Sequence, residues 1–171
     1  MKKFLLIIIF LSLNITSSFA ELPHFLDFKL ILNESIAGKK AQSFLKNKLE
    51  KGAASLKDKE KNILEEEKKI IQQKKVISND EYKKKLTELR NKVSTLRTER
   101  NKLLESVAKE RAQAKKTLLK NLNPILQAYM KEKKIRMVID KKNVLLADEN
   151  LDITKNILEI LNKKLKTIPL K

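Results

Sequence analysis

Cysteine and histidine, two residue types that often act in catalysis, are almost absent from this 171-residue sequence. There is no cysteine and the one histidine is His24, which excludes a cysteine nucleophile, a histidine pair for acid–base catalysis and a metal site of several histidines. The acidic residues lie in charge-mixed segments, and two glycines, Gly38 and Gly52, are too few for a phosphate-binding loop. The sequence therefore predicts a protein that is not an enzyme and that uses no cofactor or metal.

Lysine is the residue type that predicts binding in this chain. Lys and Arg number 39 against 21 Asp and Glu, a formal charge of +18, which favours a partner that is anionic or is bound through its acidic parts. A solvated surface is the simpler alternative for much of this charge. Near the middle of the chain, however, like charges crowd together at a cost in stability, so we hypothesise a binding role for them. These candidate contacts are Lys74, Lys75, Lys83, Lys84 and Lys85.

Two apolar repeats flank the lysine cluster. Before it, apolar residues recur at every seventh position, and after it they follow alternating steps of three and four, with Arg100 in the one slot that breaks the series. Both spacings are typical of coiled-coil helices. The first repeat comprises Leu49, Leu56, Ile63, Ile70 and Ile77, and the second comprises Leu86, Leu89, Val93, Leu96, Leu103 and Val107.

Folding the chain back between the repeats brings them into one register. Its pairs are Ile77 with Tyr82, Ile70 with Leu89, Ile63 with Leu96 and Leu56 with Leu103, flanked by a second set of Ile71 with Leu86 and Leu64 with Val93. We therefore expect an antiparallel helical hairpin, the arm, over residues 45–115. Its predicted seam consists of Leu56, Ile63, Ile70, Ile77, Tyr82, Leu86, Leu89, Val93, Leu96 and Leu103.

Ser78 and Glu81 mark the tip of the arm. A serine followed three residues later by a glutamate is a capping box, in which the serine hydroxyl accepts a hydrogen bond from the glutamate backbone N–H. The second helix is therefore predicted to begin at about Asn79, with the tip near residues 78–80. Residues 49–77 alone would extend about 45 Å at 1.5 Å per residue, so the arm projects far from any core.

The two ends of the chain must form the body that anchors the arm, and we assign residues 21–44 and 116–171 to it. We expect short strands near residues 24–28, 135–140 and 143–148, the last two as a hairpin. Three short strands expose sheet edges over a small core, so oligomerisation is expected to complete the sheet. The predicted fold is mainly α with a small β body.

Two further features belong to the second half of the body. Pro124 should kink or restart the helix that leaves the arm, because proline deletes one main-chain hydrogen bond. A final amphipathic helix is expected over residues 152–165, with Asp152 as its N-cap.

The first twenty residues have the pattern of a secretory signal peptide. Two lysines precede an apolar run of about ten residues, and Ser18 and Ala20 are small residues at the positions that a signal peptidase reads. We expect cleavage after Ala20 and export of the mature chain. A basic protein outside the cytoplasm is not expected to bind nucleic acid.

Both ends of the chain resemble the Skp/OmpH family of periplasmic chaperones. The segment FLDFKLILNESIAGKKAQSFLKNKLE is similar to the family's opening strand and helix, and IRMVIDKKNVLLADENLDITKNILEILNKK is similar to its closing hairpin and helix. The matching features include Asn33-Glu34-Ser35, Ala37-Gly38, Asp140 and Asp152-Ile153-Thr154. Across the arm the resemblance is one of architecture, and PHFLDF departs from the family's alternating aliphatic first strand.

The resemblance implies a homotrimer in the periplasm. Members of the family pool their strands into a small central barrel and project three arms around a cavity. There they hold unfolded outer membrane proteins, without using nucleotide, before these reach the insertion machinery. Basic arms that form the cavity walls would attract acidic unfolded chains.

Three functions of different class remain open. The first is the holdase chaperone, which keeps unfolded outer membrane proteins from aggregating. The second is a structural or tethering protein of the envelope, whose basic arms bind lipopolysaccharide or anionic lipid. The third, nucleic-acid binding, follows from charge alone and is disfavoured by the export signal. The polarity of the arm does not separate the first two.

Overall fold

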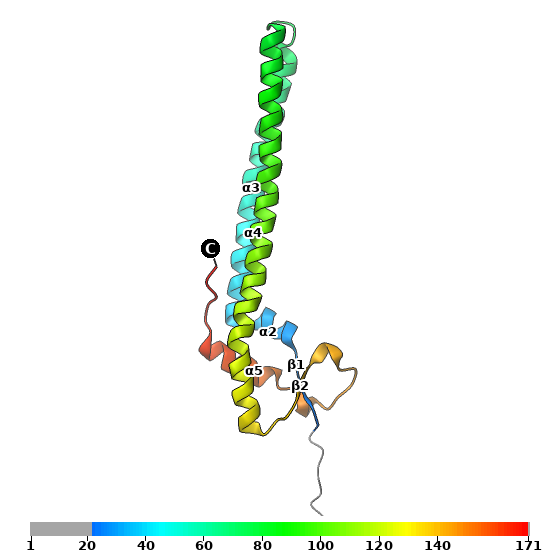
Figure 1. Ribbon diagram of the computed structural model, residues 1–171, viewed down its shortest axis with the longest axis vertical. Helices are drawn as coiled ribbons and strands as arrows, with labels where there is room; N and C mark the ends of the chain where they lie inside the picture. Colours follow the sequence, from blue (N-terminus) through cyan, green and yellow to red (C-terminus); the bar gives the residue numbers. More distant parts are fainter. Residues whose placement is uncertain (1–21, 171) are drawn as a thin grey trace, which may run out of the picture.

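The computed structural model describes residues 22–170, which form a small body at one end of a long helical hairpin (Figure 1). Helices α3 (Ile36–Gln73) and α4 (Asn79–Lys133) lie antiparallel and make the arm. The body elements are β1 (His24–Leu26), α2 (Phe28–Glu34), β2 (Val138–Asp140) and α5 (Thr154–Lys164). This is the mainly helical architecture with a small sheet that the sequence predicts. The expected signal peptide lies outside the described residues.

Two serines start the arm helices. Ser35 has extended backbone, and its hydroxyl accepts a hydrogen bond from the Gly38 N–H at 3.1 Å. Ser78 accepts in the same way from the Glu81 N–H at 3.2 Å, so α4 begins at Asn79 as predicted. The turn occupies residues 74–78, slightly before the expected tip. The 38 residues of α3 span about 57 Å at 1.5 Å per residue.

Helix α4 continues through Pro124 as one element of 55 residues, so the expected restart is wrong. Proline removes a main-chain hydrogen bond, but Leu122 and Ile125 are buried in the body core on either side of it and hold the helix in place. The helix ends where Lys134 adopts left-handed backbone, with φ of 58°, and its N–H donates to the last carbonyls of α4.

The described residues contain one sheet of two parallel strands. Its register pairs His24 with Val138, Phe25 with Ile139 and Leu26 with Asp140. On the other side of β1, the Ile153 N–H donates to the Phe25 carbonyl at 3.0 Å and a single bridge joins Phe25 to Asp152. Strand β1 therefore holds the middle position, and the outer edge of β2 is unpaired within the described chain.

The hairpin expected between residues 135–140 and 143–148 is wrong for this chain. Residues 143–148 form no strand, and β2 pairs with β1 instead. The Asp140 side chain accepts from the Lys142 N–H at 3.1 Å and turns the chain into a 3-10 helix, η1 (Lys141–Asn143). A two-residue hairpin turn favours Gly or Asn with positive φ, and the two lysines of this link do not supply it.

The other body strands and the last helix are shorter than expected. The strand near residues 24–28 ends at Leu26, because Asp27 caps α2 by accepting from the Leu30 N–H at 2.7 Å. A second 3-10 helix, η2 (Glu149–Leu151), precedes α5. Ile153, not Asp152, occupies the N-cap position of α5, although the Asp152 carboxylate accepts from the Thr154 N–H at 2.9 Å.

The body core lies where α2, α5 and the base of the arm meet. Its largest fully buried apolar side chains are Ile31 from α2, Leu118 from α4 and Ile157 and Leu161 from α5. After α5 the chain runs back along the base of the arm, where Ile168 is buried in the same core (Figure 1). The base of the arm therefore shares one core with α2, α5 and the C-terminal segment.

Candidate functional site

The predicted arm seam is only partly buried. Leu56, Ile70 and Leu89 are 8%, 3% and 8% exposed, whereas Val93 is 50% exposed, so its expected place in the seam is wrong. The remaining predicted seam residues, which are half-buried, are Ile63, Ile77, Tyr82, Leu86, Leu96 and Leu103. The arm is therefore held by a narrow apolar line.

The second apolar set does not fill the flanking positions as expected. Leu64 and Ile71 are 52% and 59% exposed, like Val93 on the facing helix. The reason lies on the other side of the seam, where polar side chains pair across the arm and hold the two helices together. The helices thus meet along the seam and the polar side, and the second set remains at the surface.

A ladder of polar contacts closes that side of the seam. It consists of Lys85 with Gln73 at 3.0 Å, Lys92 with Glu66 at 2.6 Å, Lys59 with Glu99 at 2.7 Å and Lys48 with Glu110. Each partner lies within one residue of the register predicted from the apolar pairs. The sequence analysis missed the ladder, although its residues recur at steps of seven and eleven, which place them on one helix face.

The five candidate lysines at the tip divide into two groups. The Lys74 ammonium lies 5.8 Å from the centre of the Tyr82 ring, and Lys85 donates to Gln73 and lies 3.8 Å from Glu81. These two lysines hold the turn together. The other three, Lys75, Lys83 and Lys84, are exposed and make no ion pair within the described residues.

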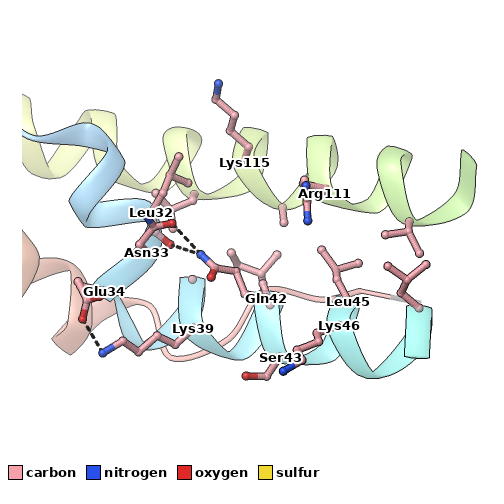
Figure 2. Close-up of a pocket in the computed structure, with 17 residues that line it drawn as sticks. Leu32, Asn33, Glu34, Lys39, Gln42, Ser43, Leu45, Lys46, Arg111 and Lys115 are labelled. Carbon is pink, nitrogen blue, oxygen red and sulfur yellow. Dashed lines mark hydrogen bonds and ion pairs between the residues drawn. The ribbon is translucent and has the colours of Figure 1, made fainter. Parts of the chain in front are cut away.

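A groove of about 980 Å³ lies at the base of the arm between α2, α3 and α4 (Figure 2). Apolar side chains such as Leu45 and Leu49 line it. Lys39, on its rim, pairs with Glu34 at 2.6 Å. Arg111 and Lys115 line it from α4 and make no ion pair within the described chain. Sequence analysis missed this groove because three separate helices contribute its lining.

Both glycines allow close approaches. A Cβ at Gly38 would overlap the Leu32 carbonyl oxygen where α2 turns into α3. A Cβ at Gly52 would lie 2.5 Å from a methyl group of Leu103, so this glycine leaves room for a seam side chain.

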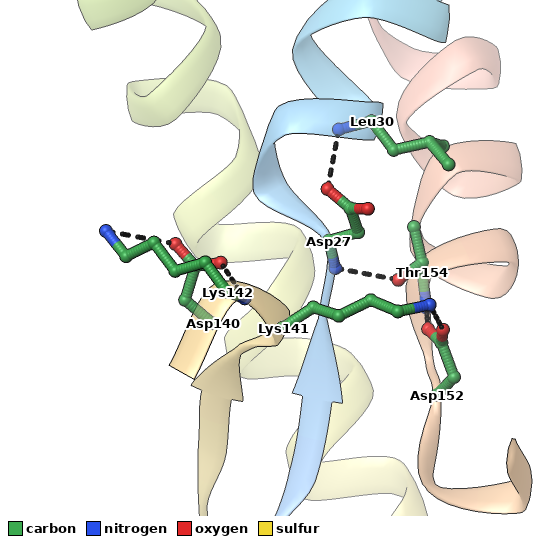
Figure 3. Close-up of polar contacts among 7 residues, drawn as sticks. All are labelled: Asp27, Leu30, Asp140, Lys141, Lys142, Asp152 and Thr154. Carbon is green, nitrogen blue, oxygen red and sulfur yellow. Dashed lines mark hydrogen bonds and ion pairs between the residues drawn. The ribbon is translucent and has the colours of Figure 1, made fainter. Parts of the chain in front are cut away.

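A polar cluster joins β1, η1 and α5 in the body (Figure 3). The Asp27 N–H donates to the Thr154 hydroxyl at 2.8 Å, and Lys141 donates to the Asp152 carboxylate at 2.9 Å. The Lys141 ammonium also lies 5.5 Å from the centre of the Phe25 ring. The cluster ties together residues far apart in the sequence, and it includes the Asp140 and Asp152-Ile153-Thr154 features of the closing segment.

The charges of this cluster stabilise each other. Burial tends to raise the pKa of Asp152, but hydrogen bonds from Thr154 and Lys141 outweigh it and hold that pKa below its ordinary value. The hydrogen bond to Asp152 raises the pKa of Lys141. Both groups are therefore charged near neutral pH, and the cluster is a structural ion pair.

The described residues contain no group of three or more His, Cys, Asp or Glu side chains that could hold a metal ion. In the same part of the chain, no helix is long and apolar enough to cross a membrane. Within the described residues, the His24 Nδ1 atom is buried without a hydrogen-bond partner, and so is the Glu110 Oε2 atom in the arm.

The fold is that of a small body that carries one long coiled-coil arm. The sequence model of the OmpH-like outer membrane protein family matches residues 24–161, so the chain belongs to this family. No curated protein sequence matches it significantly.

The fold is similar to a crystal structure from Caulobacter crescentus that is described as a candidate OmpH-like outer membrane chaperone. The TM-score is 0.81 at 21% identity, and the match covers 88% of this chain and 90% of the other. At this identity the similarity concerns the fold.

Proposed function

We propose that this protein is a periplasmic holdase chaperone that binds unfolded outer membrane proteins between basic arms without using ATP. The observation that carries the proposal is the arm itself, which extends far beyond the body and has a surplus of unpaired cations. Membership of the OmpH-like family supports a chaperone role. Many weak contacts spread along such an arm would hold an unfolded client tightly while leaving it mobile.

The cavity requires more than one arm, and we propose a homotrimer. The body supports assembly because the outer edge of β2 is unpaired within the described chain. In the segments that flank β2 in the sequence, Leu145 and Leu146 are 102% and 92% exposed, and Met137 is 59% exposed. Exposed apolar side chains next to an open sheet edge are typical of an interface between subunits.

The second candidate is an envelope tether that binds lipopolysaccharide or anionic lipid. It is favoured by one observation, the unpaired lysines Lys75, Lys83 and Lys84 at the tip, which would add about 1 kcal/mol each at an anionic surface. Flotation with phosphatidylglycerol vesicles in the absence of any client tests it.

Turbidity of a porin diluted out of urea tests the holdase function. We expect an excess of this protein to suppress aggregation of the porin without nucleotide, and to leave a folded soluble protein unbound. Aggregation that proceeds at the rate of the porin alone, together with vesicle flotation, would replace the chaperone with the tether. Suppression without flotation would exclude the tether.

A further inference from the structure

The two sides of the arm seam differ in the side chains that they carry. The ladder closes one side of the seam. Phe44, which is 42% exposed, lies on that side near the base of α3, four residues before Lys48, and Val76 lies in the turn. On the other side lie five further exposed large apolar side chains of the arm helices. They are Leu49, Leu64, Ile71, Val93 and Leu104, which are 37%, 52%, 59%, 50% and 54% exposed. We call this side the open face.

Helix geometry places these residues together. Leu64 and Ile71 are seven residues apart on α3, and Val93 and Leu104 are eleven apart on α4, spacings that return to one helix face. The groove at the base of the arm is lined by Leu49, Arg111 and Lys115, so it continues the open face into the body. A second, shallow pocket lies on the ladder side of the arm, and its lining includes the ladder residues Lys59, Glu66, Lys92 and Glu99.

The open face is also bordered by unpaired cations. Lys83, Arg90, Arg97 and Arg111 recur on α4 at steps of seven or fourteen residues, and Leu104 occupies the one gap in this row. All four cations are exposed and make no ion pair within the described residues. One ion pair, Arg100 with Glu60 at 3.4 Å, lies on this side beside the seam. The acidic residues of the ladder, in contrast, are neutralised by lysines.

We propose that the open face is the surface of the arm that contacts the client, and that the ladder face is turned away from it. This inference rests on the proposed holdase function and adds where on the arm binding occurs. The occupant that fits is an extended, unfolded segment in which apolar residues alternate with acidic ones. Its apolar side chains would cover Leu64, Ile71 and Val93, and its carboxylates would reach the row of cations.

Apolar side chains that stay in contact with water give up the stabilisation that burial would provide. Leu64, Ile71 and Val93 are about half exposed to water. A rotation of the two arm helices about their own axes would bury them and gain hydrophobic stabilisation. The polar ladder prevents that rotation, because its lysines and carboxylates would lose their partners. The arm therefore keeps an apolar surface available for a partner and uses polar contacts to hold its own helices.

Photo-crosslinking at matched positions tests the inference. Benzoylphenylalanine replaces Leu64 or Val93 on the open face. The matched positions on the ladder face are Asn62 for Leu64 and Thr95 for Val93, each two residues away in the sequence. The protein is mixed with a porin diluted out of urea. We expect the open-face positions to give at least five times more crosslinked porin than the ladder-face positions.

A combined variant provides a second readout. Leu64→Ser, Ile71→Ser and Val93→Ser together should weaken porin binding at least tenfold with little change in the melting temperature of the arm, because these side chains are half exposed. Asn62→Ser with Thr95→Ser is the control and should bind as the parent does.

The outcomes separate the inference from the function. Equal crosslinking from both faces, in a porin complex that stays soluble, would overturn the open face and leave the holdase standing. Crosslinks between arms of two copies in the absence of porin would also overturn it, because the face would then be a contact between subunits. A porin that aggregates with every variant and with the parent would remove the function itself.

Discussion

The protonation of Asp152 affects the stability of the body. Its carboxylate accepts hydrogen bonds from the Thr154 backbone N–H and from the Lys141 ammonium group. The Thr154 hydroxyl in turn accepts a hydrogen bond from the backbone N–H of Asp27, the N-cap of α2. Because these bonds lower the folded pKa of Asp152 below the ordinary 3.8, the group stabilises the fold above that value. The stabilisation is lost as the pH falls through the lowered, folded pKa.

Asp152→Asn should therefore reduce the free energy of unfolding at neutral pH. The difference from the parent should shrink as the pH falls below 3.8 and should vanish below the lowered folded pKa, where the carboxyl group of the folded parent is also protonated. Urea unfolding between pH 7 and pH 2 measures both curves. Asp58→Asn, at an exposed arm position without an ion pair in the described residues, is the control. A difference that stays constant down to the lowest pH would contradict the role given to Asp152.

The two glycines provide a matched pair. Gly38→Ala should lower the free energy of unfolding by about 2 kcal/mol or more, because the new methyl group meets the rigid Leu32 carbonyl. Gly52→Ala should change it by about 1 kcal/mol or less, because Leu103 can move its methyl groups and alanine favours the helix. Thermal unfolding of both variants measures the contrast. Equal effects would show that the close approach at Gly38 is not rigid.

At the scale of elements, the arm was predictable and the sheet was not. Two apolar repeats with one period determine the register, and Ser78 with Glu81 determines the start of α4, so local spacing was sufficient. The sequence did not show on which side of the seam further side chains of α3 and α4 would contact each other, because apolar and polar residues both recur at heptad spacing. The partner of β2 is β1, more than a hundred residues away, and no local pattern indicates such pairing.

The adjacent residues Ile70 and Ile71 test the observed orientation of α3. Ile70 is 3% exposed and Ile71 is 59% exposed. Ile70→Ala should lower the free energy of unfolding by about 2 kcal/mol, whereas Ile71→Ala should change it by about 0.5 kcal/mol or less. Helical circular dichroism during urea unfolding follows the arm. The reverse order would show that the seam lies on the other side of α3.

At the scale of the whole molecule, the proposed trimer depends on the body. Leu145→Asp with Leu146→Asp would place two charges at a surface that the assembled protein would bury. Both side chains are solvent-exposed in the single chain, so we expect its helical content to be kept while the mass falls from three chains to one. Analytical ultracentrifugation gives both masses. A variant that stays trimeric would place the interface elsewhere.

The sequence alone predicts some parts of the candidate site and not others. It indicated the arm and its basic tip, because charge and heptads are local properties. It did not indicate the open face or the groove, since each is assembled from residues of α3 and α4, or of three helices, that become neighbours only in the fold. Leu64 and Val93 were instead assigned to packing, because exposure cannot be read from apolar character alone.

The most direct test of the holdase is the light-scattering mass of residues 21–171, produced without the expected signal peptide, after mixing with a porin diluted out of urea. The account predicts a soluble species with the mass of three chains and one porin, under conditions in which porin alone precipitates. If the porin precipitates and this protein elutes with the mass it has alone, the central claim is contradicted.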